Sequence, residues 1–268
     1  MSDAGFFGPD SASWQVHRET TVLFGGARAL LLQAAHPLVI AGASATGFYE
    51  RNPWSRLMRT LHLTYAITFA SKAEARAAAE RINDVHRRVH GIDPVTGKRY
   101  DALDPDLLLW VHAALVDSAL EFERRTVGRL DEAGRQAFHD EQMLAAELLL
   151  LPRETIPPTP AALRAFIDSV IARGDLIVTP AAHRVASLFR DPPPEAEWRP
   201  VLRAVSRWAF GTLPPTLRHA YGVRWDPVKE AGLRASLAWV KTIRPFLPAS
   251  IRQIEIARRA AAQADVAR

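Results

Sequence analysis

The sequence contains 268 residues, of which 48% are hydrophobic, 24% charged and 8% aromatic. These proportions are those of an ordinary globular protein, and they exclude wholesale disorder. The chain contains no cysteine, so disulfides, thiolate metal sites, iron–sulfur clusters and cysteine nucleophiles are all excluded. Any metal chemistry must therefore use the nine histidines and the carboxylates.

The formal net charge is +5, but the basic residues do not form a run or a stripe with aromatic residues. A nucleic-acid partner is therefore not predicted. Residues Met1–Asp10 lack a basic region followed by an apolar stretch and a cleavage site, so we expect a cytoplasmic protein.

The longest uncharged run, Ala29–Tyr49, raises the question of a membrane span. It contains Gln33 and His36, and Pro37 disfavours a helical conformation at His36. We therefore expect a buried core helix that ends at His36, and no stable membrane span.

Taken in chain order, the long periodic segments separated by Pro, Gly and Asp predict an all-α protein. We expect one domain, residues 1–268, with about ten helices around a buried cofactor pocket. Strand signals are nearly absent. The predicted helices are 22–35, 53–69, 72–90, 105–127, 132–151, 160–173, 180–189, 198–210, 214–221, 227–241 and one from 249 toward the end of the sequence.

Local signals predict several of these boundaries. Ser71 followed by Glu74 forms a capping box, and Gly91 is expected to end that helix after about His90. Asp104-Pro105 is an N-cap followed by a first-turn proline. Residues 93–102 are expected to form a loop or a short hairpin, and the prolines at 192–194 a break within the domain.

The motifs GxGxxG, GxxxxGK[ST], GxSxG and HExxH do not occur. Dinucleotide-binding, P-loop, α/β-hydrolase and zincin functions therefore lose their usual support. This leaves the histidines as the candidates for chemistry.

His112 lies in a segment that is otherwise apolar on every helical face, Leu107–Val116. Such a segment is buried all round, and an unpaired imidazole there costs about 1–3 kcal/mol. His112 is therefore either a core residue bonded to a carbonyl or carboxylate, or a ligand for a metal or cofactor. His86 and His90 are four residues apart on a predicted helix, a spacing that suits either a metal site or two surface residues near a helix end.

Arg56, Arg59 and Thr60 share one face of the predicted helix 53–69. Two guanidinium groups there indicate either a solvated face or a cationic site for carboxylates or a polar oxygen species. Asp117, Glu141 and Glu147 are the candidates for a buried carboxylate, with ordinary salt bridges as the expectation for each.

These pieces together resemble the MpaB-type oxygenase family, which includes the latex clearing proteins. The resemblance spans about residues 14–190 and rests on motifs in the family's order. They are Gly25-Gly26-x-Arg28, Gln33-x-x-His36-Pro37, Gly42, Arg56-x-x-Arg59-Thr60, His86-x-x-Val89-x-Gly91, Tyr100-x-Ala102, Trp110-Val111-His112-x-x-Leu115, Glu141 and Pro152.

The resemblance implies a helical fold around haem b with a histidine as the axial iron ligand. By position His86 matches that ligand, Arg56 and Thr60 match catalytic residues, and Arg59 stands where latex clearing proteins have a lysine. His112 is the alternative ligand, and His36 is a further candidate for contact with the cofactor. The catalytic glutamate of the latex clearing proteins lies further upstream of the arginine than Glu50 does here, and the aligned segment His36–Gly42 contains no carboxylate.

The resemblance therefore implies a haem b-dependent oxygenase that uses dioxygen on an apolar, isoprenoid or lipid-like substrate. One alternative is a haem-free or non-catalytic helical protein that binds an apolar ligand. A non-haem metal hydrolase that uses His86 and His90 is the third. The sequence leaves open whether the chain forms a homodimer.

Overall fold

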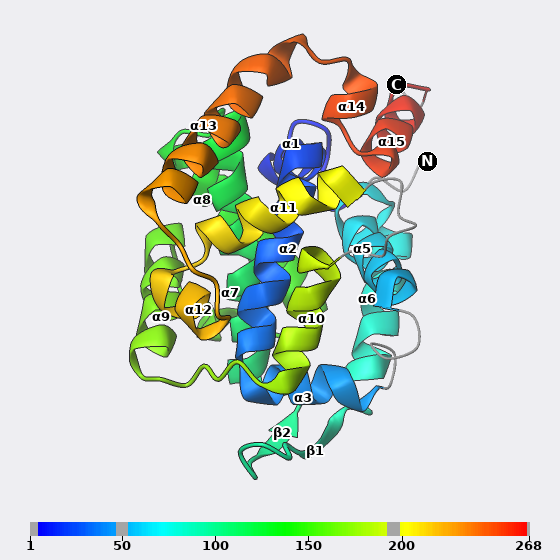
Figure 1. The fold of residues 1–268 in the computed structure, drawn as a ribbon. Helices are drawn as coiled ribbons and strands as arrows, with labels where there is room; N and C mark the ends of the chain where they lie inside the picture. Colours follow the sequence, from blue (N-terminus) through cyan, green and yellow to red (C-terminus); the bar gives the residue numbers. More distant parts are fainter. Residues whose placement is uncertain (1–4, 47–52, 192–198, 267–268) are drawn as a thin grey trace.

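The computed structural model describes residues 5–46, 53–191 and 199–266, with all their side chains except those of 53–60 and 265–266. This part of the chain is almost entirely helical, with one small two-stranded sheet (Figure 1). The all-α prediction is confirmed. The elements are α1 (Ala12–His17), α2 (Thr20–Ala35), α3 (Pro37–Ala45), α5 (Pro53–Phe69), α6 (Lys72–His86), β1 (His90–Ile92), β2 (Arg99–Asp101), α7 (Pro105–Phe122), the π-helical turn η1 (Glu123–Val127), α8 (Glu132–Leu148), the 3-10 turn η2 (Arg153–Thr155), α9 (Pro160–Ala172), α10 (Pro180–Arg190), α11 (Arg199–Thr212), α12 (Pro215–Ala220), α13 (Pro227–Ile243), the 3-10 turn η3 (Arg244–Phe246), α14 (Ala249–Arg252) and α15 (Glu255–Val266).

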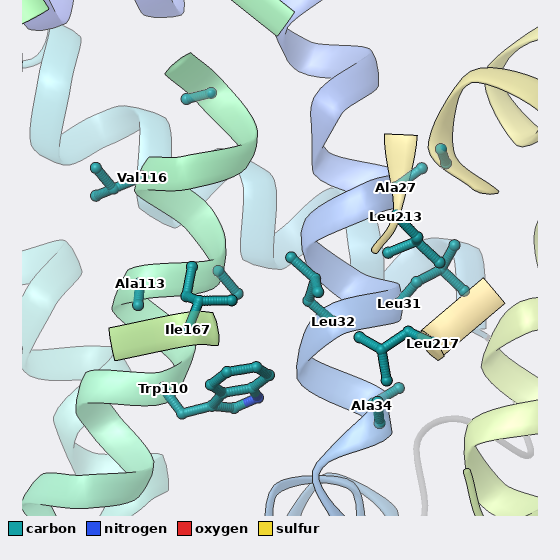
Figure 2. Close-up of a cluster of buried hydrophobic side chains, with 14 of the residues drawn as sticks. Ala27, Leu31, Leu32, Ala34, Trp110, Ala113, Val116, Ile167, Leu213 and Leu217 are labelled. Carbon is teal, nitrogen blue, oxygen red and sulfur yellow. The ribbon is translucent and has the colours of Figure 1, made fainter. Parts of the chain in front are cut away.

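Helix α2 runs through the middle of the protein and packs along α7, with α10 and α11 against its other sides (Figure 1). Its apolar residues lie nearly all round, and Leu31, Leu32 and Ala35 are fully buried. Figure 2 shows Leu32 of α2 and Trp110 of α7 pointing toward each other between the two helices. Burial of a leucine side chain contributes about 1.5–3 kcal/mol, so Leu31 and Leu32 each stabilise the core around α2.

Gly25 permits the close approach of α2 and α7. A Cβ atom at this position would lie 3.0 Å from the ring of Phe122 and 3.1 Å from the carbonyl oxygen of Ser118. A Cβ at the neighbouring Gly26 would meet nothing within 4 Å. Close packing therefore depends on the first of these adjacent glycines and not on the second.

Two ion pairs link distant parts of the fold. Arg28 is fully buried, and its Nη2 lies 2.7 Å from Oδ2 of Asp117 on α7. It also donates to Ser118 Oγ at 2.7 Å and to the Thr212 carbonyl of α11 at 3.1 Å. Glu19 and Arg244 form the second pair, which is also buried. Neither partner was predicted for these arginines, because the pairs join residues far apart in the sequence.

The chain turns sharply between α2 and α3, at His36 and Pro37. His36 has extended backbone angles and Pro37 begins α3, as the sequence predicts for a residue before proline. Among the described residues, no single helix has the length and apolar character to cross a membrane. Helices α2 and α3 reach that length and apolar character only when taken together, and the chain bends by 101° between them.

The predicted caps are confirmed at Ser71 with Glu74 and at Asp104, and Asp131 caps α8. The expected end of the helix after Ser71 is wrong, because α6 ends at His86 and His90 begins strand β1. His86 and His90 therefore do not share a helical face. The expected short hairpin is confirmed, with His90–Ile92 paired antiparallel to Arg99–Asp101.

Other elements also differ from the prediction. Helices α1 and α3 were not predicted, and α8 ends at Leu148 instead of residue 151. Helix α7 ends at Phe122 and continues as the π-helical turn η1, which ends at Gly128 with a positive φ of 67°. The last predicted helix is two helices, α14 and α15. They are separated because the amide of Ile254 donates to the Arg18 carbonyl at 2.9 Å, and this bond replaces a helical one.

Candidate functional site

His36 lies at the corner between α2 and α3, against α7. Its ring centroid is 6.2 Å from that of Trp110, and the His36 side chain is partly buried. Neither His36 Nδ1 nor the buried Trp110 Nε1 has a hydrogen-bond partner within the described part of the chain. Burial lowers the pKa of His36, so its imidazole is mainly neutral at pH 7.

Two aspartates that sequence reasoning missed contribute charge near His36. Asp175 and Asp104 raise the pKa of His36, against the larger effect of burial and that of Lys98. Asp104 is the N-cap of α7. The amide of Ile177 donates to the Ala35 carbonyl at 2.8 Å, and this bond holds the segment that contains Asp175 beside the corner. Both aspartates are exposed, so their influence is screened by solvent.

His86 is the last residue of α6 and continues the buried side of that helix. The spacing Ala75, Ala79, Ile82, His86 places these residues on one helical face, which packs toward α5 and α8. Asn83, one residue along, anchors the helix by donating to the Leu148 carbonyl at 3.0 Å. The end of α6 is thereby held in place.

The imidazole of His86 is partly buried and has a free nitrogen. Burial lowers its pKa, which keeps the ring neutral and its lone pair available at pH 7. Nδ1 of His86 is buried and, among the residues that the structure describes, has no hydrogen-bond partner. A partner that would orient the ring is therefore not found in the described residues.

The hairpin that follows α6 places Tyr100 against Gly91 and against Gly42 of α3. The amide of Ala102 donates to the Val89 carbonyl at 2.9 Å, and β2 packs against α3. A Cβ at Gly91 would lie 2.7 Å from the Tyr100 hydroxyl oxygen, so a larger residue there would force the ring to move. This packing joins the end of α6 to the corner that carries His36.

His112 faces α8, where it lies close to His139. Burial, with a smaller contribution from the positive form of His139, lowers the pKa of His112 to about 3. His139 is fully buried, and its Nε2 lies 2.8 Å from the Pro157 carbonyl. The sequence allows a carbonyl partner for His112. In the described structure such a partner is found for His139 instead, and His112 Nε2 has no hydrogen-bond partner.

Another partly buried imidazole, His17 on α1, was not singled out from the sequence. Its Nδ1 lies 3.2 Å from Thr68 Oγ1, and its ring makes edge contacts with Tyr65 and Phe138 at 5.8 and 5.4 Å. Burial lowers the pKa of His17 to about 4. No local sequence pattern identifies it, because its partners come from α5 and α8.

The other sequence candidates fall into two groups. Arg56, Arg59 and Thr60 belong to α5 as predicted, and α5 packs along α6, but their side chains lie outside the described part. The carboxylates make ordinary interactions. Asp117 pairs with Arg28 and Arg164, Glu147 pairs with Arg153, and Glu141 accepts the amides of residues 12 and 13 at the start of α1.

The described histidines do not form one metal centre. No group of three His, Asp or Glu residues with metal-binding geometry occurs in residues 5–46, 53–191 and 199–266. A shallow cavity of about 380 Å³ between the N-terminal segment and α8 is lined by Phe6, Phe7, Glu141 and Arg153 among others, and by none of His36, His86 and His112. The non-haem hydrolase alternative therefore gains no support from the described residues.

The comparison with protein families decides the classification. Residues 14–242 match the model described as "ER-bound oxygenase mpaB/B'/Rubber oxygenase, catalytic domain". The chain belongs to this oxygenase family. The match extends beyond the expected limit near residue 190 and includes α11, α12 and most of α13. Neither the comparison with curated proteins nor that with solved structures gave a match.

Proposed function

We propose that this member of the oxygenase family is a haem b-dependent enzyme that acts with dioxygen on an apolar, isoprenoid or lipid-like substrate. We further propose His86 as the axial iron ligand. The observation that supports this most directly is the family match over residues 14–242, together with the neutral, partly buried imidazole of His86 within the shared motif.

The residues present fit a haem-ligand role at His86. A histidine binds iron through a neutral nitrogen, and the lowered pKa keeps the His86 ring in that form at pH 7. The unpartnered Nδ1 shows that the ring is not already committed through that nitrogen to a protein hydrogen bond in the described structure. The haem, when bound, supplies the dioxygen chemistry.

The surrounding residues would have positioning roles. Asn83 holds the end of α6 through its bond to the Leu148 carbonyl, and small buried residues at Ala75, Ala78 and Ala79 let that helix pack closely. His36 and Trp110 each bring an unpartnered polar nitrogen to the neighbouring corner. Arg56 and Arg59 are proposed to bind the haem propionates or a polar oxygen species, and Thr60 to assist in catalysis.

A visible spectrum of protein expressed with adequate haem supply tests the proposal. We expect a Soret band that is lost in His86→Ala and retained in His112→Ala. His219→Ala is the matched control, because His219 is exposed on α12. Loss of the band in His112→Ala with retention in His86→Ala would transfer the ligand role to His112.

Metal analysis distinguishes the remaining alternative. Iron at about one atom per chain is expected from the axial-ligand proposal. Folded protein without iron or a Soret band, from which an apolar molecule is extracted, would overturn the haem proposal and support a haem-free binding protein.

A further inference from the structure

Arginines gather around one carboxylate where the start of α2 meets the segment from η3 to α14. We call Arg18, Arg129, Arg244 and Arg252 the arginine corner. Arg244 Nε donates to Glu19 Oε2 at 2.8 Å, and its Nη2 contacts the other carboxylate oxygen. Arg18 Nε lies 3.7 Å from Glu19 Oε1, a distance that permits an ion pair but not a hydrogen bond.

Backbone contacts bring these arginines together. The amide of residue 254 donates to the Arg18 carbonyl at 2.9 Å, Glu19 forms an antiparallel bridge with residue 253, and Thr20 Oγ1 donates to the Ile251 carbonyl at 2.8 Å. Arg252 therefore lies beside the start of α2. Arg129 follows η1, which packs on α2 through the Thr126–Thr21 hydroxyl contact at 2.7 Å, and its charge acts on Arg18.

The corner carries more positive charge than the nearby carboxylates can neutralise. Three of its arginines act on the fourth, Arg18, against one carboxylate, Glu19, and both oxygens of Glu19 contact Arg244. A second buried carboxylate, Glu123, accepts the backbone amide of Arg129 at 2.7 Å. Nε of Arg18 and Nε of Arg252 are buried and, in that same part of the chain, without a hydrogen-bond partner. Burial first, then Arg129, Arg244 and Arg252, lowers the pKa of Arg18, while Glu19 opposes the change. An anion would relieve this repulsion.

Exposed apolar side chains border the same corner. Phe246 is 86% exposed and Ile251 57% exposed, and each is within two residues of an arginine of the corner. The segment that carries them joins α13 to α14 at one end of the protein, with α1 nearby (Figure 1). A free anion would satisfy the arginines but would leave these two side chains in water.

We propose that the solvent-accessible arginines of the corner, Arg18, Arg129 and Arg252, bind the phosphate of an anionic phospholipid at a membrane surface, with Phe246 and Ile251 entering the acyl-chain layer. Guanidinium groups bind phosphate through paired N–H donors, and aromatic and aliphatic side chains beside them are typical of interfacial contact. This is contact with a membrane surface and requires no spanning helix. The proposal is independent of the haem and of the substrate of the oxygenase.

Co-sedimentation of the full chain with lipid vesicles tests the proposal. We expect binding to phosphatidylcholine vesicles that contain phosphatidylglycerol, and much weaker binding to phosphatidylcholine alone. Arg252→Gln should weaken the partition coefficient about fivefold, which corresponds to about 1 kcal/mol per basic residue at an anionic surface. Phe246→Ser should weaken it about tenfold or more, because the ring no longer leaves water.

Two matched controls remove similar groups elsewhere. Arg184→Gln removes an exposed arginine on α10, and Val228→Ser removes a side chain that is 80% exposed at the start of α13. Neither should change vesicle binding by as much as twofold. Arg129→Gln, at an exposed position of the corner, provides a second charge variant if Arg252→Gln fails to fold.

Three results would overturn the proposal. They are equal binding to neutral and anionic vesicles, corner variants that bind as tightly as their controls, and absence of binding to either vesicle. Titration with inorganic phosphate separates the two sources of the anion. Calorimetric binding of phosphate without vesicle binding would identify a site for a free anion and would refute the membrane contact.

Discussion

The adjacent glycines of α2 offer a test of how α2 and α7 pack, because the same substitution at each should change stability by different amounts. Gly25→Ala places a Cβ 3.0 Å from the Phe122 ring and 3.1 Å from a backbone carbonyl oxygen of α7. Gly26→Ala places it in open space. Both substitutions remove the conformational entropy cost of a helical glycine, which is about 0.5–1 kcal/mol.

The helix-propensity gain cancels in the comparison, so the difference between the two variants measures the packing cost. Overpacking of this kind costs about 1–3 kcal/mol. For a chain of 268 residues the unfolding entropy is about 560 cal/mol/K, so 1 kcal/mol shifts the melting temperature by about 2 °C. We therefore expect Gly26→Ala to melt about 1–2 °C above the parent protein, and Gly25→Ala to melt about 2–5 °C below Gly26→Ala.

Differential scanning calorimetry of the parent and both variants provides the measurement, with circular dichroism to verify equal helix content. The reasoning would be refuted if both variants raised the melting temperature by the same amount. That result would mean that α7 moves aside at no cost and that Gly25 is not required for the contact.

Two further predictions concern buried polar groups. Arg28→Met leaves Asp117 paired with the half-exposed Arg164. It should lower the free energy of unfolding by about 3–5 kcal/mol in urea titrations, whereas Arg164→Gln should cost about 1 kcal/mol or less. Equal effects would contradict a buried role for Arg28. The pKa of His112 is about 3 in the folded protein and near 6.5 in the unfolded chain. Between these pH values only the unfolded chain binds a proton at His112, so the free energy of unfolding falls as the pH falls through this window. His112→Phe should make stability less dependent on pH by up to about 1.4 kcal/mol per unit between about pH 6.5 and 4.5, and an unchanged slope would show that His112 is not buried in its neutral form.

The helix boundaries that the sequence predicted correctly depend on contacts within a few residues. Ser71 and Glu74 cap each other, Asp104 caps the turn that Pro105 begins, and Pro37 ends α2. Such signals are local and can be read from the order of residues alone. The same locality explains the wrong end of α6, where the strand formed by residues 90–92 depends on pairing with residues 99–101.

For the candidate site, the sequence indicated that His112 lies in an apolar segment, but it gave no partner for His112 and did not single out His17 or His139. His112 meets His139 of another helix, and His17 meets Thr68, which is 51 residues away. The prediction that His86 and His90 share a face failed for the same reason as the helix end. The assignments of His86, His36, Arg56, Arg59 and Thr60 to a haem site remain predictions for the spectra to test.

The sequence by itself determined the all-α class, most helix boundaries, the exclusion of thiolate chemistry and the resemblance that the family match later confirmed. The tertiary structure decided which charges are buried together, such as Glu19 with Arg244 across 225 residues, and which glycine lies at a helix contact. The physical reason is that helix formation and capping are encoded within a few turns of chain. Burial, charge pairing and the ionisation of a histidine depend instead on side chains that meet only after the helices have packed.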